Sequence, residues 1–98
     1  MFDWDTANIG HIAEHNVLPH DAEEAYNSNP LYLDYSVEDG ELRHREVGET
    51  ATGRILVIIS TMSGELVRIV TAYWADRPLR VTYLAFKESE QHGKENHS

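Results

Sequence analysis

Residues 54–61, RILVIIST, decide the fold. Five consecutive apolar residues occupy positions 55–59, and most of them are β-branched. Because successive side chains of a strand point to opposite sides, a strand with this sequence has two apolar faces. Strands of this kind lie inside a sheet that is covered on both faces. We therefore expect a central, doubly covered strand here.

Three further strands are expected around this central one. A Ser-Gly-Glu turn at 63–65 leads directly into residues 66–73, which are rich in Val and Ile. Residues 31–36 and 41–48 are joined by a turn around 38–40, as the two arms of a hairpin are. Short connections of this kind join antiparallel neighbours, so the sequence predicts a four-stranded antiparallel sheet.

Helical spacing appears twice before the first of these strands. Thr6 is the expected N-cap of a helix whose apolar residues recur at i, i+3 and i+4 until about Asn16. Pro19 suits the first turn of a second short helix, which the Asn-Pro pair at 29–30 stops. Residues 2–5 alternate apolar and acidic residues, as a short edge strand does. The apolar residues expected in the core are Ile9, Ile12, Leu18, Ile55, Val57, Ile59, Val67 and Ile69.

The C-terminal part admits two interpretations. Leu79, Tyr83 and Phe86 share one helical stripe, although residues 80–86 also have the composition of a strand. We favour a C-terminal helix, which makes the chain an α+β domain covering residues 1–87. Residues 88–98 are polar, so we expect them to form a disordered tail.

The charge of the chain is strongly negative and unevenly distributed. Seventeen acidic residues face eight basic ones, for a formal net charge of −9. Residues 1–42 hold ten acidic residues and no Lys or Arg, so this half carries −10. A field of this sign repels a phosphate polymer, which argues against strong non-specific nucleic-acid binding. A local basic site remains compatible with it.

The cellular setting follows from features that the sequence lacks. No apolar run approaches the roughly 20 residues that a membrane helix needs. The first residues lack the basic stretch and apolar core of a signal peptide, and the chain has no Cys. We therefore expect a soluble cytoplasmic protein that does not bind a membrane.

Several short motifs occur in order between residues 2 and 77. They are Phe2-x-Trp4-Asp5 with Asn8, then His15-Asn16-Val17, Glu23-Glu24-Ala25, Tyr35-Ser36, Gly40-Glu41, Arg43, Gly48, Gly53-Arg54 and Val67-Arg68-Ile69-Val70-Thr71-Ala72. The number, order and spacing of these motifs resemble the BrnT family of bacterial ribonuclease toxins. The resemblance implies a RelE-like fold, RNA as substrate and a small DNA-binding antitoxin as partner.

The resemblance also suggests which residues carry the chemistry, with no metal or cofactor required. The expected catalytic residues are His15, Arg43, Arg68 and Tyr73, and the expected RNA-binding residues are Arg45, Arg54 and Arg77. An imidazole titrates near pH 6.5, so His15 is suited to proton transfer. The alternative is a helix-terminal His whose ring nitrogen satisfies a backbone carbonyl.

Strand alternation supports a basic site independently of the resemblance. Arg43 and Arg45 are two residues apart, so both project from one face of their strand, and His44 projects from the other. Arg54 and Arg68 belong to the next two strands. The planar guanidinium fork suits phosphate, so these arginines predict a phosphate site. In the alternative interpretation they pair with neighbouring carboxylates, Glu41, Glu46, Glu49 or Glu65.

Departures from the family pattern define a rival hypothesis. Glu14 stands where the family has Lys, Tyr73 where it has Arg, and Asn16 where it has Gly. The last helix also lacks the family's basic cluster. Each missing cation weakens the stabilisation of a dianionic transition state. The rival is a non-catalytic protein-interaction module that kept the fold and the antitoxin-binding surface.

Overall fold

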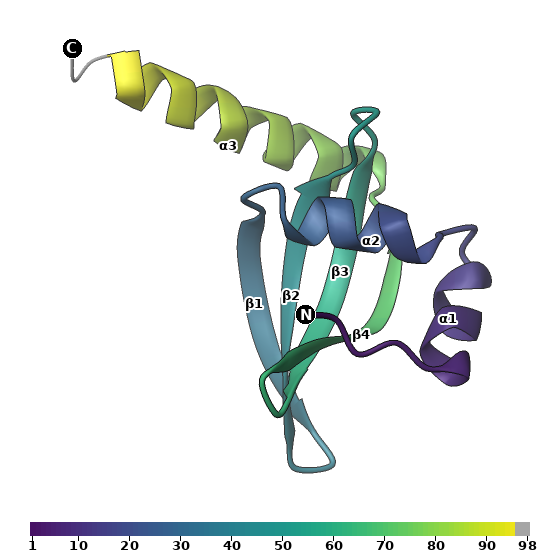
Figure 1. The fold of residues 1–98 in the computed structure, drawn as a ribbon. Coiled ribbons are helices and arrows are strands. Elements are labelled where there is room, and N and C mark those ends of the chain that lie inside the picture. The colour runs from purple at the N-terminus through teal and green to yellow at the C-terminus, as the bar shows by residue number, and fades with distance from the viewer. Residues whose placement is uncertain (96–98) are drawn as a thin grey trace.

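The computed structural model describes residues 1–95, with side chains up to residue 91. The elements in chain order are α1 (Thr6–Ala13), α2 (Pro19–Tyr26), β1 (Leu31–Glu38), β2 (Glu41–Glu49), β3 (Ile55–Ser63), β4 (Leu66–Trp74) and α3 (Arg77–Glu95). Figure 1 shows the sheet with α2 lying across it and α1 beside β4. The expected α+β architecture, with two short N-terminal helices, a four-stranded antiparallel sheet and a C-terminal helix, is confirmed.

The sheet is an antiparallel meander with strand order β1-β2-β3-β4. Strand β3 lies inside it, hydrogen-bonded to β2 on one side and to β4 on the other. Residues 55–58 are all buried, which confirms the central, doubly covered strand. Residues that pair across strands project from the same face, so the register decides which side chains meet.

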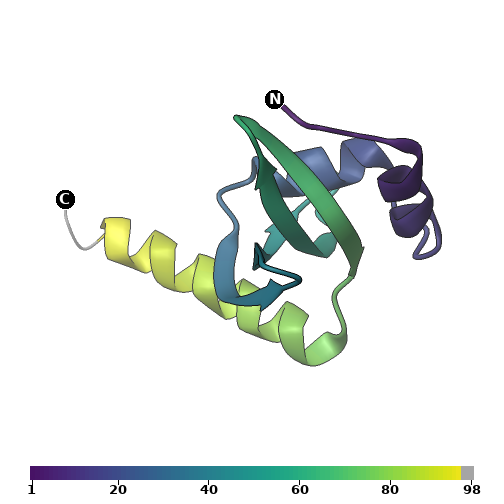
Figure 2. The same ribbon diagram turned by 90° about the horizontal axis from the view of Figure 1, so that it is seen from below.

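The helices cover the two faces of the sheet. Seen from below, α1 and α2 lie on one side of the sheet and α3 on the other (Figure 2). The core under α1 and α2 consists of Ile12, Val17, Ala22, Ala25, Leu56, Ile58, Val67, Ile69 and Ala72. The core under α3 consists of Val47, Ile55, Val57, Ala75 and Tyr83. Leu56 and Val57 thus contribute to opposite cores, as strand alternation requires.

Helix α2 packs very closely on β2 at a glycine. A Cβ atom on Gly48 would overlap the backbone carbonyl of Ala25. The Ser28 hydroxyl donates to the Ala25 carbonyl at 2.7 Å and accepts the Glu49 N–H at 3.0 Å. Glycine is therefore required at position 48, and these bonds fix the end of α2 against the sheet.

Two details at the N-terminal helices correct the sequence expectation. Asp5, not Thr6, is the N-cap of α1, because its carboxylate accepts the Asn8 N–H at 2.8 Å. Ile9 and Leu18 are exposed, and Val17 takes the core position expected for Leu18. Leu18 is instead the residue that precedes the first turn of α2. Ile59 is only half-buried, whereas the remaining expected core residues are buried: Ile12, Ile55, Val57, Val67 and Ile69.

The edge strand expected at residues 2–5 is reduced to one parallel bridge between Phe2 and Val67. The Asp3 N–H donates to the Val67 carbonyl at 2.8 Å. The Asn8 side-chain amide donates to the Ile69 carbonyl at 2.9 Å. These contacts satisfy part of the free edge of β4 and tie α1 to it.

Helix α3 is longer than expected. The Asp76 carboxylate accepts the Leu79 N–H at 3.1 Å at its start, and the helix runs to Glu95. Residues 88–95, expected to lie in a disordered tail, therefore continue the helix, whereas 96–98 lie outside the described residues. Glu, Lys and Gln are strong helix formers, which accounts for the extension. None of the helices in the described part is long and apolar enough to cross a membrane.

Candidate functional site

The turn after α1 fixes the position of His15. The Asn16 N–H donates to the Ala13 carbonyl at 3.0 Å, and the Val17 N–H donates to the Ile12 carbonyl at 3.1 Å. This pair of bonds forms a Schellman motif, with Asn16 in the left-handed region at φ 60°. Asn tolerates that region better than other residues with a Cβ, so it can replace the glycine of the family motif here.

His15 lies beside the β4 edge, in contact with Tyr73. Their ring centroids are 6.1 Å apart, with 59° between the ring planes. His15 is exposed and Tyr73 is half-buried. Within the described side chains, the His15 ring makes no hydrogen bond, so the alternative of a ring nitrogen bonded to a backbone carbonyl is not realised. Both ring nitrogens are therefore free to bond to solvent or to a bound molecule.

Arg45 adjoins Tyr73 on the same face of the sheet. The Asp34 carboxylate accepts two hydrogen bonds from Arg45, at 2.9 and 2.6 Å. This carboxylate first, and the Tyr73 hydroxyl next, raise the pKa of Arg45, while the guanidinium lowers the pKa of Asp34. His15, Tyr73 and Arg45 are therefore contiguous, although they come from three separate segments of the chain.

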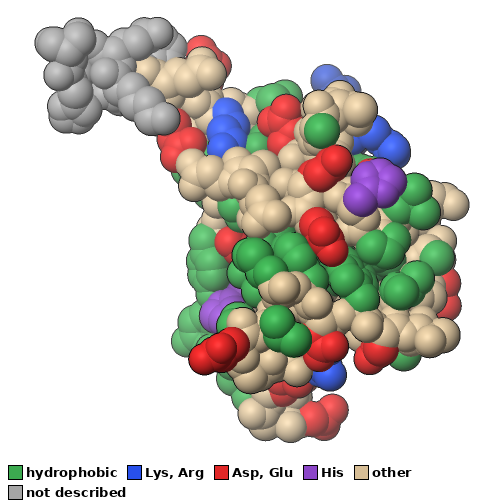
Figure 3. Space-filling view, in the orientation of Figure 1, with side chains coloured by type: hydrophobic (Ala, Val, Ile, Leu, Met, Phe, Trp, Pro, Cys, Tyr) green, Lys and Arg blue, Asp and Glu red, His purple; other side chains and the backbone are tan. Residues whose placement is uncertain are grey.

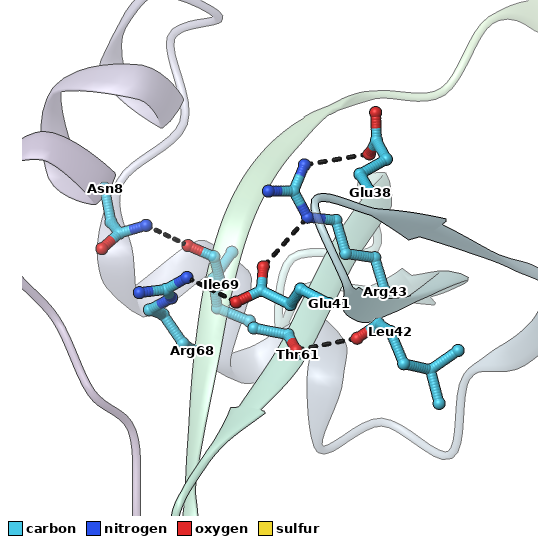
Figure 4. Close-up of polar contacts among 8 residues, drawn as sticks. All are labelled: Asn8, Glu38, Glu41, Leu42, Arg43, Thr61, Arg68 and Ile69. Atoms are coloured by element: carbon cyan, nitrogen blue, oxygen red, sulfur yellow. Dashed lines mark hydrogen bonds and ion pairs between the residues drawn. The ribbon is translucent and has the colours of Figure 1, made fainter.

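A second pair of arginines lies further along this face. Arg43 and Arg68 lie in one row across the sheet. His44 pairs with Ser60, which places Arg43 opposite Thr61, and Thr61 pairs with Arg68. The Glu41 carboxylate lies between them, as Figure 4 shows. It accepts a hydrogen bond from Arg43 Nε at 3.1 Å and from Arg68 Nη2 at 3.0 Å.

The Glu41 bridge is only partly accessible to solvent. The side chains of Arg43, Glu41 and Arg68 are 25%, 32% and 34% exposed. Arg68 Nε is buried and has no hydrogen-bond partner in the described part of the molecule. Arg43 also donates from Nη1 to Glu38 at 2.9 Å, and Glu41 and Glu38 together raise its pKa. The bridge therefore holds both guanidinium groups in fixed orientations.

Carboxylates neutralise the arginines on this face. Asp34 pairs with Arg45, and Glu38 pairs with Arg43. Glu41 pairs with both Arg43 and Arg68. Three cations thus meet three anions, and a phosphate approaching this face meets little net positive charge. Arg43, Arg45 and Arg68 thus lie on one face, each paired with a carboxylate. Of the partners expected from the sequence only Glu41 is used, and the others are Asp34 and Glu38.

Arg54 and Arg77 lie elsewhere, at the end of the sheet where β3 begins and α3 starts. The Arg54 guanidinium carbon stacks 3.5 Å from the centroid of the Trp74 ring. Arg77 is exposed in the first turn of α3. In the space-filling view, Lys and Arg side chains lie mostly along the upper edge of the molecule (Figure 3). The structure therefore separates Arg54 and Arg77 from the other predicted residues, and it adds Arg80, which the sequence reasoning missed.

A cavity of about 520 Å³ lies between α2, the β2–β3 connection and α3. Its polar groups already have internal partners. The Tyr83 hydroxyl donates to Glu49 at 3.2 Å, and Glu24 accepts the Ala51 N–H at 3.0 Å. Lys87 donates to the carbonyls of residues 28 and 29 at 3.4 and 2.9 Å. These bonds tie α3 to the body of the domain, so we assign this cavity a structural role.

A scan against models of known protein families finds no match to this chain. A search of curated proteins also finds no relative. The resemblance to the BrnT family therefore rests on the sequence motifs alone. The functional argument has to come from the site itself.

Proposed function

We propose that this chain is a metal-independent endoribonuclease of the BrnT type that cuts single-stranded RNA. The observation that supports the proposal best is the contiguity of His15, Tyr73 and Arg45. A proton-transfer group, a hydroxyl donor and a guanidinium side by side are the components that phosphodiester cleavage needs. The Arg43–Arg68 row extends the same face and would hold a neighbouring phosphate.

In this mechanism the RNA 2′-hydroxyl attacks the adjacent phosphorus, and the bond to the 5′-oxygen breaks. His15 accepts the proton of the 2′-hydroxyl, and Arg45 stabilises the charge that develops on the phosphate oxygens. The Tyr73 hydroxyl donates a hydrogen bond to the same phosphate. The leaving 5′-oxygen takes up a proton from water, so the products are a 2′,3′-cyclic phosphate and a 5′-hydroxyl.

The proposal is tested with single-stranded RNA in the presence of a chelator, with the cyclic phosphate as the measured product. Replacing His15 by Ala should lower the rate by roughly 10²- to 10⁴-fold, the usual contribution of a general base. Arg45→Ala, which removes the guanidinium that stabilises the developing charge, should lower it by roughly 10²- to 10³-fold. His11, exposed on α1 four residues earlier, gives the matched control, and His11→Ala should cut at the normal rate.

Two outcomes would contradict the proposal in different ways. Cleavage by the His15→Ala protein at the normal rate would remove the assigned base. Intact RNA after incubation with the unmodified protein, together with harmless expression in bacteria, would remove the nuclease function and favour the second candidate.

The second candidate is a non-catalytic module that binds a small, basic, DNA-binding antitoxin. An exposed apolar surface on the α1–α2 side of the sheet favours it. Tyr35 and Val37 are 66% and 64% exposed, and they pair across the hairpin with His44 and Leu42. Met62 is also exposed. Exposed apolar side chains gathered on one part of a sheet face are typical of protein interfaces.

This surface can be tested separately from the RNA site. Val37→Glu places a charge on the apolar surface, on the face opposite the arginines. It should weaken binding of a candidate antitoxin, measured by calorimetry, and leave RNA cleavage unchanged. If Val37→Glu and the unmodified chain bind the antitoxin equally, this surface is not the interface.

A further inference from the structure

A small hollow opens at the end of the sheet where β3 begins and β4 ends. Its volume is about 230 Å³, and its lining consists of Gly53, Arg54, Ile55, Trp74, Ala75 and Arg80. Drug-sized ligands occupy pockets of roughly 300 to 1,000 Å³, so this hollow suits a smaller occupant. It lies apart from the cluster around Glu41, because neither Arg43 nor Arg68 lines it.

Both guanidinium groups that line the hollow are held in place. Arg54 stacks on the Trp74 ring at 3.5 Å, a cation–π contact that leaves the N–H donors at the edge of its plane free. Arg80 donates from Nη1 to the Ala75 carbonyl at 2.8 Å, and its remaining N–H groups make no hydrogen bond within residues 1–91. Two oriented cations with free donors are a preorganised site for an anion.

The charge around the hollow differs from that of the other arginine cluster. No ion pair involves Arg54, Arg77 or Arg80 among the described side chains, whereas Asp34, Glu38 and Glu41 neutralise the other cluster. Two carboxylates belong to neighbouring segments. Asp76 caps α3 at the Leu79 N–H, and Glu49 accepts from Tyr83. Neither of them lines the hollow. The unneutralised positive charge of the described chain is thus concentrated at this end.

We propose that this hollow is an oxyanion site that binds one phosphate group between Arg54 and Arg80, with Trp74 as its apolar wall. A guanidinium pair matches the tetrahedral oxygens of phosphate by bidentate, charge-assisted hydrogen bonds. The phosphate comes either as the free ion or as part of a single-stranded nucleic acid. This site does not depend on the proposed cleavage chemistry, since it shares no residue with the His15–Tyr73–Arg45 group or the Arg43–Arg68 pair. Of its two arginines, only Arg54 was expected from the sequence to bind RNA.

The test uses the full chain and two probes, inorganic phosphate and a single-stranded DNA oligonucleotide that the proposed mechanism cannot cut. Binding is followed by calorimetry and by tryptophan fluorescence, because an anion that contacts Arg54 changes the environment of Trp74. The fluorescence change should disappear in the Trp74→Phe protein, which keeps Trp4. Arg54→Ala and Arg80→Ala should each weaken binding about 10-fold or more, as expected for the loss of charge-assisted bonds.

Arg77 supplies the matched control. It lies in the same first turn of α3 and is exposed like Arg80, but it does not line the hollow. Arg77→Ala should therefore change the affinity by less than about 3-fold, the effect of one nearby charge in salt solution. Binding of phosphate alone identifies a free-ion site, and binding of the oligonucleotide alone identifies a site for a strand phosphate. Equal losses for Arg77→Ala and Arg80→Ala, or no saturable binding of either probe, would overturn the proposal.

Discussion

The Glu41 bridge leads to a prediction about RNA binding at the proposed site. Its carboxylate lies between Arg43 and Arg68, at 3.1 and 3.0 Å, where the phosphate of a substrate would lie. A phosphate can use these two cations only after it displaces the carboxylate or approaches alongside it. Glu41→Gln removes the negative charge and keeps the shape of the side chain. We expect this variant to bind single-stranded RNA more tightly than the unmodified protein.

The size of the effect follows from Coulomb's law. A carboxylate about 5 Å from a bound phosphate repels it by about 1 to 3 kcal/mol, for an effective dielectric constant between roughly 80 and 20. Physiological salt, with a Debye length of about 8 Å, lowers this by roughly half. The expected gain in affinity is therefore about 2- to 20-fold. Stability should fall by about 1 kcal/mol, because partly exposed ion pairs contribute little.

Fluorescence anisotropy with a 2′-O-methyl oligonucleotide measures this gain without cleavage, and repeating it across a salt series separates the electrostatic part. Glu38→Gln is the matched control, because Glu38 pairs with Arg43 alone and is more exposed than Glu41. Its gain should be smaller than that of Glu41→Gln. Equal affinities for Glu41→Gln and the unmodified protein would refute the argument that the Glu41 carboxylate keeps phosphate away from Arg43 and Arg68. If neither protein binds RNA, the whole face has no role in RNA binding.

Two further predictions concern stability. Burial raises the pKa of Tyr83 to about 12, and Glu49 adds to this. The tyrosine of the unfolded chain ionises near pH 10, so the free energy of unfolding should fall by about 2 kcal/mol between pH 10 and pH 12. Urea denaturation at several alkaline pH values should show this loss of stability in the unmodified protein and a smaller loss in Tyr83→Phe. The same dependence of stability on pH in both proteins would contradict the prediction. Asn16 has φ 60°, so Asn16→Ala should lower the free energy of unfolding by about 1 kcal/mol, whereas Asn16→Gly should leave it unchanged. The control Asn27→Ala, at φ −88°, should change it by no more than about 0.5 kcal/mol. Equal stability of the Ala and Gly variants at position 16 would contradict the turn argument.

Most of the fold could be predicted because its signals are local. The β-branched run at 55–59 and the turns around residues 39 and 64 place all four strands to within two residues at each end. Local spacing does not show which of two adjacent apolar residues turns inward. Leu18 was expected in the core, but the Schellman turn directs Val17 there instead. The polar end of α3 was missed because its helical propensity, not apolar periodicity, accounts for it.

The candidate site was predicted less completely because it depends on register across long connections. The tight turn at residue 64 pairs Ser63 with Leu66, which already places Thr61 opposite Arg68. The connection between β2 and β3 sets no such register, so the alignment of Arg43 with that row could not be derived from the sequence. Arg54 was grouped with the other arginines although it precedes the first residue of β3. One residue at a strand end suffices to move a side chain from a sheet face to the rim.

The net charge of −9 and the two arginine clusters are compatible once their partners are considered. On the sheet face, carboxylates from β1 and β2 hold the guanidinium groups in place, so the geometry is preorganised while the field is cancelled. At the rim, Trp74 and a backbone carbonyl orient Arg54 and Arg80 without cancelling their charge. A phosphate chain repelled by the acidic surface would therefore be attracted first to the rim. Arg43 and Arg68 would bind only a phosphate that displaces Glu41, so this carboxylate would disfavour weak, non-specific binding.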